Sequence, residues 1–186
     1  MVEPKAFLRV FAALTPLFLA GCGGDMDPIA TATTQAPAHS VMTPSGASPR
    51  PATLAVTQLD APEPLKSKFL ALFNADAAKQ DIALTDTAGA RYLARGYLSA
   101  YPTDGGARLT YVWDIYDNKA HRAQRLNDEV AIKGASPDPW SLVDAASLAS
   151  LAQRSADEVA AYLSNTPEAL AAAQTPSRAL SYAPIR

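Results

Sequence analysis

The stretch ARLTYVWDIYD, residues 107–117, constrains the fold most, because its apolar and polar side chains alternate along its length. The larger apolar residues that share one side of the extended chain are Leu109, Tyr111, Trp113 and Ile115. Alternation with a period of two, in a segment rich in aromatic and β-branched residues, predicts a half-buried strand. We expect this strand to be central in its sheet, with the Trp113 side packed against helices.

Two further strands are expected beside this one. The segment RYLARGYLSAYP, residues 91–102, precedes it across the turn signal TDGG, residues 103–106. The segment RAQRLNDEVAIK, residues 122–133, follows it across the turn DNKAH, residues 117–121. Short turns join antiparallel neighbours, so the three segments predict a meander. Gly96 is expected to weaken the first strand or to mark a bulge.

Helical patterns stand before and after the meander. In residues 65–80 one helical face carries Leu65, Phe69, Leu72 and Phe73. Residues 81–84, DIAL, are a short strand candidate. Residues 140–163 form a long Ala-rich helical pattern, for which Asp138 fits the N-cap and Pro139 the first helical position.

These elements predict an α+β domain over residues 64–165. Its expected architecture is an antiparallel sheet of three to four strands with two helices packed on one face. Residues 166–186 are expected to be a loose tail, in which PEALAAAQ could form a short helix.

The amino-terminal 21 residues have the pattern of an export signal. Lys5 and Arg9 precede an apolar run over residues 10–20, which is well short of the ~20 residues that span a bilayer. Gly21 and then Cys22, the one cysteine of the chain, follow the run. A single cysteine excludes an intrachain disulfide framework and a multi-cysteine zinc site.

The residues Leu19, Ala20, Gly21 and Cys22 resemble the lipobox of bacterial lipoproteins. The resemblance implies cleavage before Cys22, a diacylglycerol on its thiol and an acyl chain on its new amino group. Two or three such chains hold a protein stably on a bilayer. Gly23 follows the cysteine in place of the Asp of the enteric-type inner-membrane signal, which implies the outer membrane, facing the periplasm. The alternative is a buried free cysteine behind an ordinary cleaved signal.

Residues 22–63 are expected to form a disordered tether behind the acylated cysteine. Ala, Thr, Ser and Pro dominate this range, and aromatic residues are absent from residues 23–63. Such a composition buries too little apolar surface to offset the entropy of ordering. Residues 53–59, TLAVTQL, alternate in places and are interpreted as a candidate edge strand. The net charge of the whole chain is −2, which gives no reason to expect a nucleic-acid partner.

The domain is similar to small periplasmic lipoproteins of alphaproteobacteria over residues 91–163. The shared features are the Arg-Gly strand, the Val-Trp-Asp strand with its Asp-Asn turn, and the Asp-Pro-Trp helix start. The order of elements also resembles the amino-terminal domain of TolB and the outer-membrane lipoproteins that activate penicillin-binding proteins. The resemblance implies an interaction module on a long tether, although architecture alone does not establish function.

The sequence gives little support for a catalytic or metal-binding site. His121 with Asp114 and Asp117 could be read as a metal trio, but Asp117 and Asn118 are residues that turns prefer. The neighbouring acids Asp128 and Glu129 lack a second group at a sequence spacing that would suggest general acid–base catalysis. We therefore expect no catalytic residue, no metal and no cofactor, and the chain is not expected to be an enzyme.

A candidate interaction surface lies in the meander. If they share the open face of the sheet, Tyr97, Tyr101 and Tyr116 form an aromatic surface. A small basic cluster lies beside them: Lys119, His121, Arg122 and Arg125. The expected partner is a periplasmic or envelope protein, with peptidoglycan carboxylates as another candidate.

The sequence is thus compatible with three functions. The leading hypothesis is a non-enzymatic, lipid-anchored interaction or assembly module of the cell envelope. The second is an envelope hydrolase or metal-dependent enzyme that uses His121 with nearby carboxylates. The third is a carrier of a lipid or apolar ligand held between the sheet and the long helix.

Overall fold

The structure is a computed structural model that describes residues 42–175. The signal segment, the lipobox with Cys22, and residues 22–41 of the expected tether lie outside the described residues. So do residues 176–186 of the tail. Eight elements follow in order: β1 (Leu54–Asp60), α1 (Leu65–Lys79), β2 (Tyr92–Thr103), β3 (Gly106–Tyr116), β4 (Arg122–Lys133), the 3-10 helix η1 (Pro139–Leu142), α2 (Ala145–Ser164) and α3 (Pro167–Gln174).

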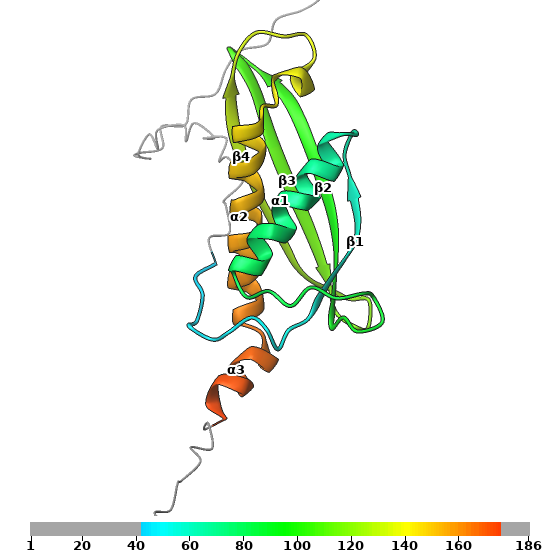
Figure 1. Ribbon diagram of the computed structural model, residues 1–186, viewed down its shortest axis with the longest axis vertical. Coiled ribbons are helices and arrows are strands. Elements are labelled where there is room, and N and C mark those ends of the chain that lie inside the picture. Colours follow the sequence, from blue (N-terminus) through cyan, green and yellow to red (C-terminus); the bar gives the residue numbers. More distant parts are fainter. Residues whose placement is uncertain (1–41, 176–186) are drawn as a thin grey trace, which may run out of the picture. The chain divides into compact units, whose positions relative to one another are not determined.

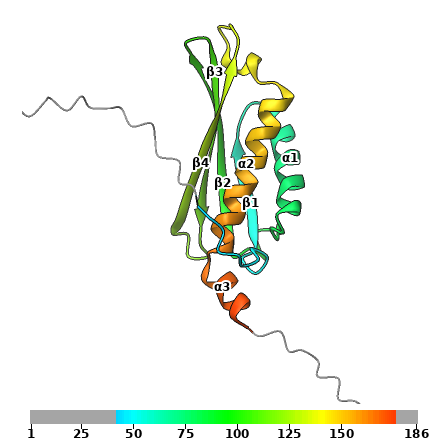
Figure 2. The same cartoon turned by 90° about the vertical axis from the view of Figure 1, so that its left-hand side faces the viewer.

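The four strands form one sheet in the order β1-β2-β3-β4. The long helices α1 and α2 lie on one side of it, so the sheet has one covered and one open face (Figures 1 and 2). The α+β class is thereby confirmed, and β2, β3 and β4 pair antiparallel as expected. One feature differs from the expected antiparallel sheet, because β1 runs parallel to β2. Parallel neighbours need a crossover connection, and α1 supplies it.

Strand β1 lies inside the range that the sequence assigned to the tether. The ordered domain therefore begins before residue 64. The register of β1 shifts between Val56 and Gln58, so Leu54 and Val56 face the core before the shift and Leu59 faces it afterwards. In place of the strand expected at residues 81–84, the structure has one isolated β-bridge, between Leu54 and Leu84.

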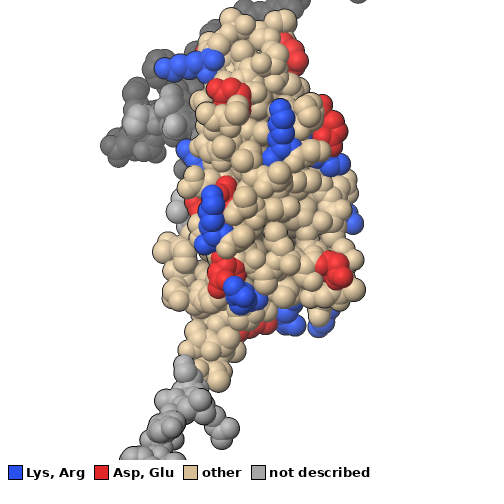
Figure 3. All heavy atoms as spheres, viewed as in Figure 1, with Lys and Arg blue, Asp and Glu red and all other residues tan. Residues whose placement is uncertain are grey.

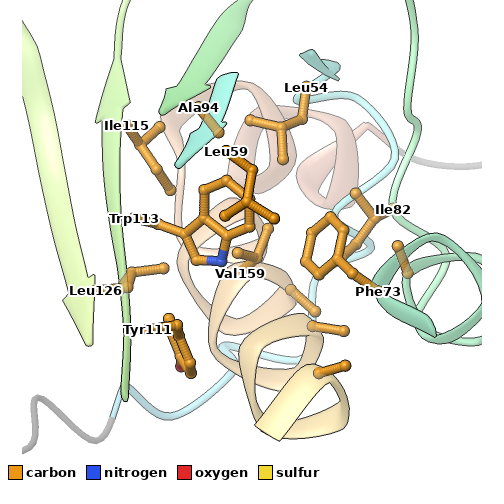
Figure 4. Packing of buried hydrophobic residues seen from close by; sticks show 14 of the residues in the cluster. Leu54, Leu59, Phe73, Ile82, Ala94, Tyr111, Trp113, Ile115, Leu126 and Val159 are labelled. Atoms are coloured by element: carbon orange, nitrogen blue, oxygen red, sulfur yellow. The ribbon is translucent and has the colours of Figure 1, made fainter. Parts of the chain in front are cut away.

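The core lies between the covered face of the sheet and the two helices (Figure 4). Trp113 is at its centre and is 1% exposed. Its indole nitrogen donates a hydrogen bond to Ser155 Oγ of α2 over 2.6 Å, and the Phe73 ring of α1 lies 5.3 Å from its ring, centroid to centroid. One strand residue thus contacts both helices, which fixes how the layers pack.

Gly96 of β2 is explained by this tryptophan and not by a bulge, since β2 and β3 pair without a register shift. A Cβ atom placed on Gly96 would lie 2.4 Å from Trp113 Cζ3 and 2.7 Å from Leu59 Cδ1. The absence of a side chain lets the indole lie directly against the backbone of β2.

The long helix expected over residues 140–163 is two elements. The Asp138 carboxylate accepts a hydrogen bond from the Trp140 N–H and caps η1, which ends at Leu142. Asp144 then caps α2 by accepting from the Ser147 N–H over 2.7 Å. The second cap, which the sequence analysis did not identify, starts the helix five residues later than expected.

Helix α1 buries Phe69, Phe73 and Ala77, spaced four residues apart, against the sheet. The short helix expected in PEALAAAQ is present as α3. Among residues 42–175, none of the helices has the length and apolar character needed to cross a bilayer.

The free edge of β4 is occupied at its centre by side chains. The Glu129 N–H donates to Asp128 Oδ1 over 2.7 Å. Arg154 of α2 donates to Glu129 O and to Asp128 Oδ2, each over 3.2 Å. The N–H and C=O of one residue in an antiparallel strand point the same way, so both backbone groups of Glu129 turn outward and are already bonded.

Candidate functional site

One face of the sheet has no covering layer among residues 42–175 (Figure 2). Alternation places every second residue of each strand on it. Its central residues are Arg95, Tyr97, Ser99 and Tyr101 of β2, Arg108, Thr110, Val112, Asp114 and Tyr116 of β3, and Arg125, Asn127 and Glu129 of β4. We call this surface the open face.

The three tyrosines named from the sequence do share the open face. Tyr97 is 39% exposed and Tyr101 is 56% exposed, whereas Tyr116 is half-buried. Tyr97 is the register partner of Val112, and Tyr116 is the partner of Leu93, so Tyr116 lies toward one end of the sheet and Tyr101 toward the other. The other aromatic residues of the meander, Tyr92, Tyr111 and Trp113, are buried on the helix side.

The centre of the open face holds a carboxylate with arginines around it. The side chain of Asp114 is 7% exposed, and its Oδ1 lies 3.2 Å from Arg125 Nε and 3.6 Å from Arg122 Nη1. Oδ1 is within ion-pair range of both groups but outside hydrogen-bond geometry, while Oδ2 accepts from Arg125 Nη2 over 3.3 Å. Both cations come from β4. The Asp114 carboxylate thus holds two of the predicted basic residues in place.

Lys119 and His121, the other two members of the predicted basic cluster, lie apart from it in the turn before β4. His121 Nδ1 is 3.6 Å from Asp117 Oδ2, and its side chain is 76% exposed. The Asp117 carboxylate accepts from the N–H groups of Lys119 and His121, and the hydrogen bond from His121 is the main cause that lowers the pKa of Asp117. Asp117 therefore serves to build the turn.

The metal trio does not assemble. Asp114 is bound by arginines of β4, whereas Asp117 closes the turn that holds His121. Among residues 42–175 there is no group of three or more His, Cys, Asp and Glu side chains arranged to hold a metal ion.

The space between the sheet and α2, where a carried ligand was considered, is filled by the side chains of the core around Trp113. An apolar groove of about 360 Å³ lies instead at the surface between α1 and α2, lined in part by Leu65, Leu72, Val143 and Leu148. On this helix side, charges of both signs are interspersed among uncharged residues (Figure 3).

Arg95 is an open-face residue that the sequence pattern did not bring forward as a candidate. Its guanidinium carbon lies 5.6 Å from the centroid of the Tyr116 ring, which is a cation–π geometry. Within the described part of the chain, no carboxylate lies within ion-pair distance of it. The signal was present in the alternation of RYLARGYL, since Arg95 and Tyr97 take the same phase.

Comparison with known proteins gives no family. No family of known proteins matches the chain, and no curated protein matches it either. Several solved structures are similar in part, among them the following three. A minor lipoprotein from Acinetobacter baumannii has 14% identity and a TM-score of 0.42, with 60% of this chain and 94% of that chain covered.

A PelC dodecamer from Paraburkholderia phytofirmans has 14% identity and a TM-score of 0.38, with 63% of this chain and 92% of that chain covered. TolB from Acinetobacter baumannii has 15% identity and a TM-score of 0.30, with 67% of this chain but 29% of that chain covered. None of these TM-scores reaches 0.5, so the similarities assign no function to this chain.

Proposed function

We propose that this chain is a lipid-anchored protein of the cell envelope, held at the outer membrane through Cys22 and facing the periplasm. Its domain acts as a non-enzymatic module that binds an envelope protein through the open face. The anchor is supported by the sequence Leu19-Ala20-Gly21-Cys22. The module is supported by one observation above all: a sheet face without a covering layer that exposes two tyrosines among arginines.

The composition of the open face suits a protein interface. Tyrosine and arginine are enriched at the buried centres of interfaces, and both bring large contact area. Five cations lie on this face (Arg95, Arg108, Arg122, Arg125 and Lys133) against three carboxylates (Asp60, Asp114 and Glu129). The whole chain has a net charge of −2, so the open face is positive on a slightly acidic protein. Charge complementarity therefore favours a partner with an acidic surface.

Site-specific crosslinking in cells tests the module. A photoreactive amino acid at Tyr97 or at Tyr101 should capture the same envelope protein, and the yield should fall at high salt. The same group at Gln153, which is exposed on α2, is the matched control. Equal capture from all three positions, or capture that salt does not weaken, would refute the role of the open face.

The anchor is tested separately. The native chain should incorporate labelled palmitate and remain with outer membranes, whereas a Cys22→Ser variant should do neither. Recovery of the variant in the same membrane fraction would contradict the anchor.

The groove between α1 and α2 favours one second candidate, a carrier of an apolar ligand. Its volume of about 360 Å³ is at the small end for ligand sites. Native mass spectrometry of the chain purified from its own cells decides between the two, because a carrier retains a ligand mass in addition to the acyl groups.

A further inference from the structure

A small hollow on the open face lies beside the bulge of β1. Thr57, Leu93, Arg95, Tyr116 and Ala120 line it, and its volume is about 290 Å³. We propose that this hollow binds an acidic side chain of the partner together with the apolar residue next to it. The inference rests on the proposed function and deepens it, because it gives the open face a specific point of recognition.

The charge of Arg95 is available to a ligand. Asp114 is the register partner of Arg95 across β2 and β3, but its carboxylate is engaged by Arg122 and Arg125 from the other side. Two guanidinium groups thus bind the Asp114 carboxylate, and Arg95, on the neighbouring strand, has no ion pair among the described residues. A carboxylate brought by a ligand would supply the missing partner.

Tyr116 holds Arg95 in a useful orientation. The Arg95 guanidinium carbon lies 5.6 Å from the centroid of the Tyr116 ring, and this cation–π attraction does not use up the N–H donors of the guanidinium. These donors match the two oxygens of a carboxylate, which gives geometric selectivity as well as attraction.

The walls of the hollow are formed in advance. Leu93 and Tyr116 are paired across the sheet. Ala120 is fixed at the rim by the turn, in which its N–H donates to Asp117 O over 3.1 Å and the Asp117 N–H donates to His121 O over 2.9 Å. Thr57 donates its hydroxyl to Ala94 O over 3.0 Å. A ligand would therefore meet an existing shape and would not have to order a loop.

The lining favours a peptide over a phosphate group. One cation lines the hollow, and its other walls are Leu93, Tyr116, Ala120 and Thr57. Phosphate sites gather several donors, such as backbone N–H groups at a helix start or clustered cations. One arginine beside apolar walls instead matches a glutamate or aspartate with an apolar neighbour.

The test uses the mature acylated chain in detergent micelles and nuclear magnetic resonance. The probe is the capped dipeptide acetyl-Glu-Leu-amide, and the controls are acetyl-Gln-Leu-amide and inorganic phosphate. We expect saturable shifts of the amide signals of Leu93, Tyr116 and Ala120 with the Glu probe. The Gln control should bind about tenfold more weakly, because it loses the charge-assisted pair.

Two variants complete the test. Arg95→Gln should weaken binding of the Glu probe about tenfold, as expected for the loss of one charge-assisted pair. Arg108→Gln is the matched control, since Arg108 is also an open-face arginine but pairs with Glu129 at 3.2 Å and does not line the hollow. It should bind the probe as the native chain does. Because Arg95 is exposed, its variant should keep the native spectrum elsewhere.

The assignment is overturned by equal binding of the Gln control, by unchanged binding to Arg95→Gln, by equal shifts with phosphate, or by the absence of saturable shifts. If crosslinking from Tyr97 and Tyr101 still captures an acidic partner, such a result refutes binding at the hollow and leaves the proposed function of the open face standing. If that capture fails as well, the proposed function fails with it.

Discussion

Replacement of Gly96 by alanine tests how closely the sheet and the tryptophan are packed. The new Cβ atom would lie 2.4 Å from Trp113 Cζ3 and 2.8 Å from Trp113 Cε3. Carbon atoms in contact prefer a separation of about 3.5–4.0 Å. The indole has little freedom to move away, because it is hydrogen-bonded to Ser155, packed against Phe73 and 1% exposed.

The expected cost follows from two opposing effects. Forcing an extra carbon into a packed core costs about 1–3 kcal/mol, and the clash here lies at the severe end. Replacing a glycine by alanine returns about 0.4–1 kcal/mol by restricting the unfolded chain. We expect Gly96→Ala to lower the free energy of unfolding by about 2 kcal/mol.

Equilibrium urea unfolding measures this loss, with native and variant chains both carrying Cys22→Ser so that no detergent is needed. For a slope of about 2 kcal/mol per molar, the midpoint should fall by about 1 M. Trp113→Phe, which removes the fused second ring, should reduce the cost of Gly96→Ala by about 1 kcal/mol. A neutral or stabilising Gly96→Ala, or strictly additive costs in the double variant, would refute the close approach.

Three further predictions concern hydrogen bonds and titrating groups. Ser155→Ala leaves the buried indole N–H of Trp113 without its acceptor, and should cost about 1–3 kcal/mol in urea unfolding. The hydrogen bond from the Ser147 hydroxyl is the main cause that lowers the pKa of Asp144 below its ordinary value of 3.8. The ionised cap therefore stabilises the fold at pH values above 3.8, and this contribution is lost as the pH falls through the folded-state pKa. Asp144→Asn keeps an acceptor without the charge, and a stability difference from the native chain that stays constant from pH 7 to pH 2 would contradict this reasoning. Burial raises the pKa of Tyr162 to about 12 from its ordinary value of 10.0. Between these two pH values the folded state keeps the phenol proton and the unfolded chain loses it, so the free energy of unfolding should fall as the pH rises through this range. Tyr162→Phe should make that fall shallower, as measured by thermal unfolding against pH, and an unchanged slope would argue that other groups dominate.

The meander and the helices on one face could be predicted because each follows from a local pattern. Strands β2, β3 and β4 alternate, their turns are short, and α1 repeats its apolar residues at helical spacing. Strand β1 was harder to predict because the bulge near Thr57 changes the phase of its alternation. Its pairing with β2 also depends on residues some forty positions away, which a local pattern does not reveal. The start of α2 was misplaced because Asp138 and Asp144 both fit a cap, and in the structure Asp138 caps the short η1 whereas Asp144 caps α2.

The sequence was sufficient to predict which tyrosines share the open face, but not how the charged residues are arranged on it. The alternation of β2 and β3 puts Tyr97, Tyr101 and Tyr116 in one phase, which the structure reproduces on the open face. The sequence grouped four basic residues by their nearness along the chain. The structure separates Arg122 and Arg125, held by Asp114, from Lys119 and His121 in the turn. Arg95 joins the face from another strand, and only the register of the sheet brings it beside Tyr116.

The bonds around Glu129 bear on how this domain could associate with other chains. A strand added along β4 would need the backbone N–H and C=O of Glu129, and these are already taken by Asp128 and Arg154. Growth of the sheet into a neighbouring molecule would first have to release an arginine from the adjacent helix. The Arg154 side chain, which reaches over the free edge of β4, thus hinders the edge-to-edge stacking of sheets that would produce a fibre. It favours contacts with other molecules through the open face instead.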